Sequence, residues 1–83
     1  MIKKKQAVKT PKERKTPLQR EFGKIIREKR LAMGFSQEEL AEHAGLHFTY
    51  VSSTERGERN ISLMNIAKFA KALRCSMTDL MPK

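Results

Sequence analysis

Cysteine, tryptophan and long apolar segments are scarce or missing in this 83-residue sequence, and each absence removes a class of protein. Cys75 is the only cysteine, so the chain cannot form an internal disulfide and its stability does not depend on oxidation. No apolar run approaches the length of about 20 residues that a membrane-spanning helix needs, and we recognise no signal peptide. These absences predict a cytoplasmic chain without a membrane partner.

Catalytic and metal-binding patterns are missing as well. The sequence has no glycine-rich phosphate loop, no Ser/His/Asp or Cys/His arrangement and no pair of carboxylates on a shared face. His43 and His47 are close in sequence, but Gly45 lies between them and no third ligand accompanies them. We therefore expect neither an enzyme nor a metal site, and no cofactor or small-molecule ligand.

Positive charge is concentrated at the start of the chain. The net charge is +9, and residues 1–15 contribute +6 of it, with seven basic side chains against one acidic side chain. These residues have no apolar periodicity, which predicts a flexible basic arm ahead of a folded domain at residues 16–83. Such a distribution favours a polyanion as partner, although a solubilising tail has the same composition.

Apolar spacing predicts helices within residues 16–83 and no strand. The segment from Pro17 to about Met33 has apolar residues at i, i+4, i+7 and i+8, which is typical of an amphipathic helix. Another helix is expected after Ser62, and a last short helical turn over residues 77–81. The expected core comprises Phe22, Ile26, Leu40, Ala41, Ala44, Leu46, Val51, Leu63, Ile66, Phe69, Ala70, Leu73 and Leu80.

Residues 36–57 are the most informative stretch, because they predict two short helices joined by a tight turn. Ser36 and Glu39 have the spacing of a capping box at the start of the first helix. Gly45 follows where a helix commonly ends in a left-handed residue, and a second helix is expected over roughly His47–Arg56. Two such helices form the helix-turn-helix of DNA-binding proteins, although other small helical proteins contain similar hairpins.

The same residues resemble the Xre/Cro family of lambda-repressor-like domains. The likeness rests on Gly-Phe-Ser-Gln-Glu-Glu-Leu-Ala at 34–41, Ala-Gly-Leu at 44–46 and Glu-Arg-Gly at 55–57. Within that family, residues 46–51 and 55–63 are most similar to the controller proteins of restriction–modification systems. The resemblance covers about residues 22–80. It implies an all-α domain of five helices and a transcription regulator that binds a two-fold DNA operator as a homodimer.

The resemblance also implies a role for individual residues around the second helix of the motif. Glu55 is a carboxylate on the inner face of that helix, and the partner that the family implies for it is Arg30. Phe48 stands where controller proteins often place an arginine, which leaves the operator sequence open. The implied base contacts are Phe48, Thr49, Ser52 and Ser53. The expected contacts to the DNA backbone are Gln37, His47, Tyr50, Arg56, Arg59 and Asn60.

Apolar residues near the end of the chain suggest where a second copy binds. We expect the homodimer to use Met77, Leu80 and Met81, and the alternative is that these side chains pack within one protomer. Two other functions stay open. A phage-type repressor or an antitoxin has the same sequence features as a controller. A bridging module could use the same fold for protein contacts and the basic arm for non-specific nucleic-acid contacts.

Overall fold

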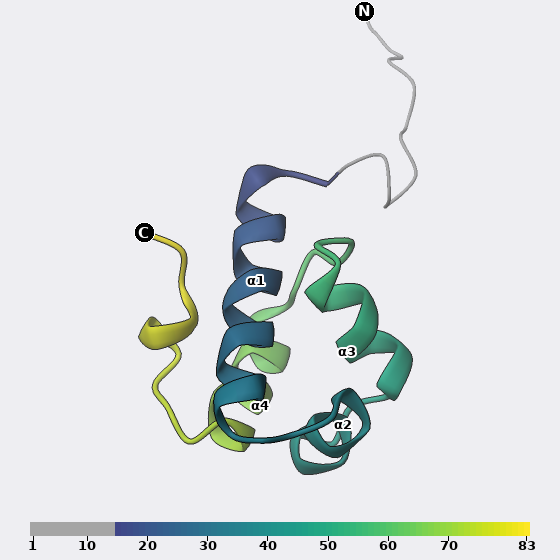
Figure 1. Ribbon diagram of the computed structural model, residues 1–83. Coiled ribbons are helices and arrows are strands. Elements are labelled where there is room, and N and C mark those ends of the chain that lie inside the picture. The colour runs from purple at the N-terminus through teal and green to yellow at the C-terminus, as the bar shows by residue number, and fades with distance from the viewer. Residues whose placement is uncertain (1–14) are drawn as a thin grey trace, which may run out of the picture.

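The structure, a computed structural model, describes residues 15–83, and all regular elements in that range are helical (Figure 1). The expected all-α fold is confirmed, but the fifth expected helix is a single 3-10 turn. Except for Lys15, the expected basic arm lies outside the described residues. The elements are α1 (Pro17–Ala32), α2 (Gln37–Ala44), α3 (Phe48–Glu55), α4 (Leu63–Ala72) and the 3-10 turn η1 (Thr78–Leu80).

Side-chain caps fix where the first two helices begin. At α1 the Thr16 hydroxyl accepts from the Gln19 amide at 3.1 Å, and the Gln19 side chain accepts from the Thr16 amide at 2.8 Å. Ser36 and Glu39 form the same reciprocal capping box at α2, as their spacing predicts. Each box satisfies two backbone donors that lack partners within the helix, so the direction of the chain into both helices is set locally.

The turn between α2 and α3 depends on Gly45. Its φ is +67°, in the left-handed region. Residues with a side chain adopt that region at a cost of roughly 1–2 kcal/mol. The reversal lets the Leu46 amide donate to the Ala41 carbonyl at 2.9 Å. The chain therefore turns at once after α2, and α3 packs directly against it.

α1 runs between α3 and η1, which lie on opposite sides of it in Figure 1. Gly23 brings α1 close to the end of α3. A Cβ atom at this position would lie 2.3 Å from the Thr54 carbonyl oxygen, so any other residue would force the two helices apart. α4 packs against α2 and η1 and completes the core. The fully buried apolar side chains are Ile26, Leu40, Val51, Phe69 and Leu80.

The prediction that Leu63 belongs to the core is wrong, because its side chain is 73% exposed. Leu63 is the first residue of α4, and Met64 beside it is also exposed, so the first turn of this helix has little packed against it. Ile61, which precedes the Ser62 cap, packs on the core at this end instead. Helical spacing identifies the buried face of α4 correctly, but it wrongly extends that buried face to the first turn of the helix.

Thr54 provides a test of the core, because its buried Oγ1 has no hydrogen-bond partner in residues 15–83. Thr54→Val replaces the hydroxyl with a methyl group of similar size. We expect it to raise the free energy of unfolding by about 1–2 kcal/mol in urea titrations, because an unpartnered buried hydroxyl is destabilising. The same change at exposed Thr49 is the control, with an expected effect below about 0.5 kcal/mol. A loss of stability in Thr54→Val would show that the hydroxyl is satisfied.

Candidate nucleic-acid interface

The N-terminal turn of α3 is open to solvent. The Phe48 side chain is 43% exposed, and Thr49 next to it is exposed as well. His47 caps the helix, since its Nδ1 accepts from the Thr49 amide at 3.1 Å, and this leaves Nε2 to donate to another group. The turn thus presents an aromatic ring, a hydroxyl and a ring N–H. These groups can contact a thymine methyl, a base edge and a phosphate, respectively.

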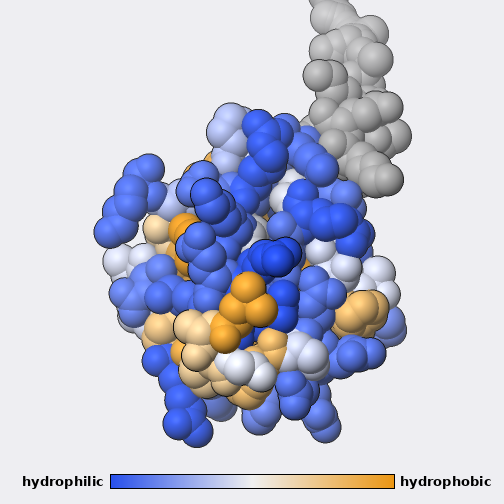
Figure 2. Space-filling model, in the orientation of Figure 1, coloured by the Kyte–Doolittle hydropathy of each residue, from blue (hydrophilic) through white to orange (hydrophobic). Residues whose placement is uncertain are grey.

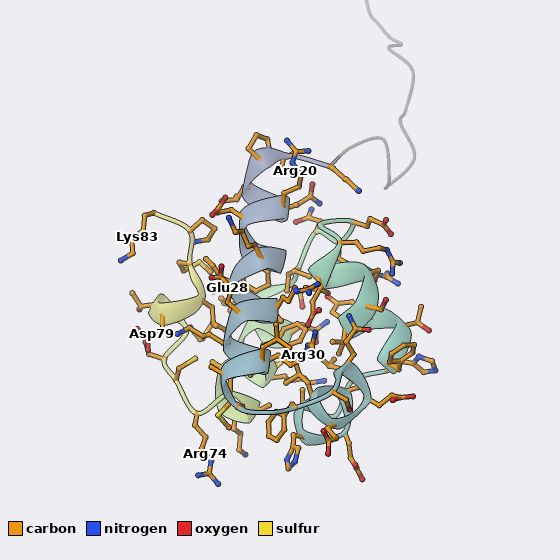
Figure 3. All side chains as sticks on the ribbon, in the orientation of Figure 1. Arg20, Glu28, Arg30, Arg74, Asp79 and Lys83 are labelled. Atoms are coloured by element: carbon orange, nitrogen blue, oxygen red, sulfur yellow. The ribbon has the colours of Figure 1, made fainter. Side chains whose placement is uncertain are left out.

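Arg30 and Glu55 form the expected ion pair. Arg30 Nε donates to Glu55 Oε2 at 2.6 Å and Arg30 Nη2 donates to Oε1 at 3.1 Å, so the contact is bidentate. The two side chains are only 9% and 3% exposed. Arg30 Nη1 also donates to the Phe35 carbonyl at 2.8 Å. The pair therefore joins α1, where Figure 3 shows Arg30, to the end of α3 and to the loop before α2.

Gln37 belongs to the same group of side chains, a contact that the sequence did not indicate. Its Nε2 donates to Glu55 Oε1 at 2.9 Å, which fixes the first residue of α2 to the last residue of α3. Gln37 is expected to contact the DNA backbone, and one of its two side-chain hydrogens is used inside the protein. The other hydrogen and the Gln37 and Glu38 backbone amides remain suited to a phosphate, whereas the Glu39 amide is bound to Ser36.

Arg56 is held by Glu58, which the sequence assigns only to a polar loop. Arg56 Nε and Nη2 donate to the two Glu58 oxygens at 3.1 and 3.2 Å, and Nη1 donates to Ser52 Oγ at 2.5 Å. Lys15 Nζ lies 3.9 Å from Glu58 Oε2. The positive charge of Arg56 is therefore partly compensated, and Lys15, where the expected basic arm joins the domain, lies beside the loop that follows α3.

The prediction of Ser53 as a base contact is wrong for this structure, because the residue is only 5% exposed. The chain after α3 folds back along the helix, so that the Glu58 amide donates to the Ser53 carbonyl at 3.0 Å. The Ser53 hydroxyl donates to the Tyr50 carbonyl at 3.1 Å and accepts from Arg59 Nε at 2.7 Å. Helical spacing places Ser53 on the outer face, but it does not show that the following loop covers it.

The other expected contacts to the DNA backbone lie at the surface of the same region. Arg59 and Asn60 are exposed, whereas Tyr50 is half-buried. The Arg59 guanidinium carbon is 4.9 Å from the centre of the Tyr50 ring, within the range of a cation–π contact. Ser52, the fourth expected base contact, is half-buried and already accepts from Arg56.

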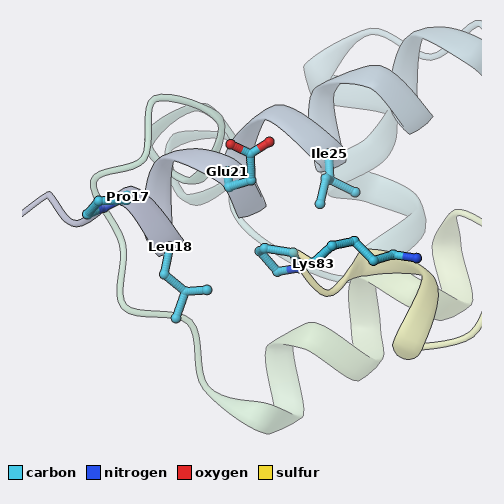
Figure 4. Close-up of a pocket in the computed structure, with 6 residues that line it drawn as sticks. Pro17, Leu18, Glu21, Ile25 and Lys83 are labelled. Atoms are coloured by element: carbon cyan, nitrogen blue, oxygen red, sulfur yellow. The ribbon is translucent and has the colours of Figure 1, made fainter.

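The expected dimer residues are divided between the core and the surface. Leu80 is buried within the protomer, so its prediction as a dimer contact is wrong, and Met77 packs against the core. Met81 remains exposed. Next to it, a groove of about 590 Å³ separates α1 from the C-terminal residues (Figure 4). Its lining residues are Pro17, Leu18, Glu21, Ile25, Pro82 and Lys83.

Hydrophilic side chains cover most of the face that Figure 2 presents, and charged residues make up 33% of the chain. Among residues 15–83, no group of three His, Cys, Asp or Glu side chains is placed to hold a metal ion. No helix in this part of the chain is both long and apolar enough to cross a membrane.

The close packing of α2 and α3, the Gly45 turn and the exposed start of α3 define a helix-turn-helix domain. A family model described as "Helix-turn-helix" matches residues 26–80, and the chain belongs to this Xre/Cro-type family of DNA-binding regulators, which are not enzymes.

Controller proteins and other regulators are among the known proteins that are similar to the chain. Control protein C.BamHI of Bacillus amyloliquefaciens is 49% identical over 61 residues, which are 72% of this chain and 75% of the relative. The crystal structure of the restriction–modification controller protein C.AhdI from Aeromonas hydrophila is 48% identical, with a TM-score of 0.73 over 75% of this chain and 94% of that chain. The biofilm regulator SinR, solved in complex with DNA, is 37% identical, with a TM-score of 0.69 over 71% of this chain and 95% of that chain.

The buried ion pair can be tested with Arg30→Met, Glu55→Met and the double variant. Each single change leaves a buried charge without its partner, so we expect a loss of about 3–5 kcal/mol in the free energy of unfolding. The double variant should lose less than the sum of the two, because neither charge then remains. Chemical denaturation measures all three, and Glu42→Met, at an exposed position, is the control. Small and additive losses would contradict a buried, coupled pair.

Proposed function

We propose that this chain is a sequence-specific regulator that binds a two-fold DNA operator as a homodimer in the bacterial cytoplasm, and that it controls a restriction–modification system. The proposal rests chiefly on the exposed start of α3, which the buried Arg30–Glu55 pair holds at a fixed place on a basic domain. The names of C.BamHI and C.AhdI support the controller assignment, and the SinR complex supports DNA as the partner.

In this proposal the N-terminal turn of α3 enters the major groove. Phe48 and Thr49 contact base edges, because their side chains are exposed there. The Ser52 hydroxyl accepts from Arg56, and its own hydrogen can still be donated to a base edge. The backbone contacts on either side are Gln37, His47, Tyr50, Arg56, Arg59 and Asn60.

The homodimer is proposed to use Met81 and the groove between α1 and the C-terminal residues. Leu18, one of the most exposed apolar side chains of the domain, lines this groove together with Lys83 (Figure 4). Contact with a second copy would remove this apolar surface from water. The groove lies across α1 from α3, so pairing there leaves the start of α3 uncovered (Figure 1).

Selection of duplexes from a random pool tests the proposal. The selected duplex should bind at least about 10³-fold more tightly than a scrambled one. It should bind two protomers whose recognition helices lie about 34 Å apart. Phe48→Ala should weaken binding to the selected duplex only, whereas the control Leu31→Ala, an exposed apolar residue at the end of α1, should not.

If the selected and the scrambled duplex bind with nearly equal affinity, a bridging module is favoured instead. A single protomer per duplex would contradict the homodimer. The phage-type repressor and the antitoxin are separated from the controller by the neighbouring genes, which for a controller encode a methyltransferase and an endonuclease.

The basic arm should add affinity but no sequence preference. Removing residues 1–14 deletes six basic side chains but keeps Lys15, which lies beside Glu58. Log affinity falls as log salt rises, and each phosphate that the protein no longer neutralises makes this negative slope shallower by about 0.9. We expect the slope to become shallower by a few units and the ratio of selected to scrambled affinity to stay the same. Replacing the arm with an uncharged Gly/Ser segment of equal length is the control for chain length, and an unchanged slope would identify the arm as a passive tail.

A further inference from the structure

Two arginines at the end of α3 are held in opposite ways. Arg56 donates from Nε and both Nη groups, to the Glu58 carboxylate and the Ser52 hydroxyl. Within residues 15–83, Arg59 donates from Nε alone, to the Ser53 hydroxyl at 2.7 Å. Its two Nη groups have no hydrogen-bond partner in residues 15–83. A carboxylate therefore compensates the charge of Arg56, whereas a neutral group holds Arg59.

The groups that hold Arg59 are themselves fixed. The Ser53 hydroxyl donates its hydrogen to the Tyr50 carbonyl, so its lone pairs are left for Arg59 Nε. The Tyr50 ring lies under the guanidinium and stacks on Phe69, with ring centres 6.4 Å apart and an interplanar angle of 24°. Phe69 is fully buried. The support of Arg59 thus extends into the core, although Arg59 itself is exposed.

We propose that Ser53 and Tyr50 are positioning residues that preset the Arg59 guanidinium for a DNA phosphate beside α3. An arginine that is already ordered loses less side-chain entropy when it binds, and its paired Nη groups match the oxygens of a phosphate. Arg59 therefore supplies more of the binding than Arg56, although both are exposed arginines of the same segment. This assignment rests on the proposed function, because it takes DNA as the partner.

The test is a double-mutant cycle with Ser53→Ala and Arg59→Ala, measured on selected and random duplexes at several salt concentrations. Arg59→Ala should weaken binding to both duplexes about tenfold, the usual size of a charge-assisted hydrogen bond. It should make the negative slope of log affinity against log salt shallower by about 0.9. Ser53→Ala should weaken binding severalfold when Arg59 is present and not at all when Arg59 is alanine.

Ser52 and Arg56 provide a matched control, since they are also a serine and an arginine in contact at this end of α3. Arg56→Ala should weaken binding less than Arg59→Ala, because Glu58 already compensates Arg56. Tyr50→Phe keeps the ring and should retain the coupling between residues 53 and 59, whereas Tyr50→Leu should reduce it.

Three results would overturn the assignment. An equal loss from Ser53→Ala in both backgrounds would mean that Ser53 acts through folding and not through Arg59. A loss confined to the selected duplex would mean that Arg59 reads a base. An effect of Arg56→Ala as large as that of Arg59→Ala would remove the distinction between them. If the wild-type protein shows no preference for the selected duplex, the proposed function fails, but the cycle on random duplexes still tests Arg59.

Discussion

The position of α3 depends on one buried carboxylate. Glu55 receives hydrogen bonds from Arg30 of α1 and from Gln37 of α2, and Arg30 also binds the Phe35 carbonyl in the loop between those helices. A buried charge is costly unless it is paired and its remaining lone pairs are satisfied, and both oxygens of Glu55 accept here. Hydrogen bonds are directional, whereas apolar contacts tolerate sliding. We therefore infer that these charges, more than the small apolar core, fix the rotation of α3 about its axis.

The close approach of α1 to α3 also restricts the C-terminal end of α3. Gly23 leaves no room for a Cβ atom against the Thr54 and Glu55 carbonyls, and the Thr54 hydroxyl is buried there without a partner in residues 15–83. The C-terminal half of α3 is therefore committed to contacts within the protein. Its N-terminal turn is capped only by His47 and stays open. This division along the helix leaves a short exposed surface at its start and anchors the remainder.

The sequence predicts local features of this fold better than contacts between segments. The caps at Ser36 and Glu39 and the reversal at Gly45 are decided by neighbouring residues, and the structure has them. The family resemblance, and not the spacing, implies the partner of Glu55. Ser53 and Leu63 are misjudged because a helical projection treats each helix as isolated. The loop after α3 covers Ser53, whereas Leu63 stays exposed at the start of α4. The contacts made by Glu58 depend on the same loop, so composition could not reveal them.

Two bidentate Arg–Glu pairs in this small domain differ in how firmly they hold the arginine, because they differ in burial. The Arg30–Glu55 side chains are 9% and 3% exposed, so water cannot replace either partner and the pair fixes geometry. In the Arg56–Glu58 pair the glutamate side chain is 12% exposed, but the arginine side chain is 53% exposed and remains in contact with water. A phosphate can therefore reach the exposed side of Arg56. Glu58 reduces the charge that α3 offers to a polyanion without removing it, and counting the basic residues of the domain overstates that charge.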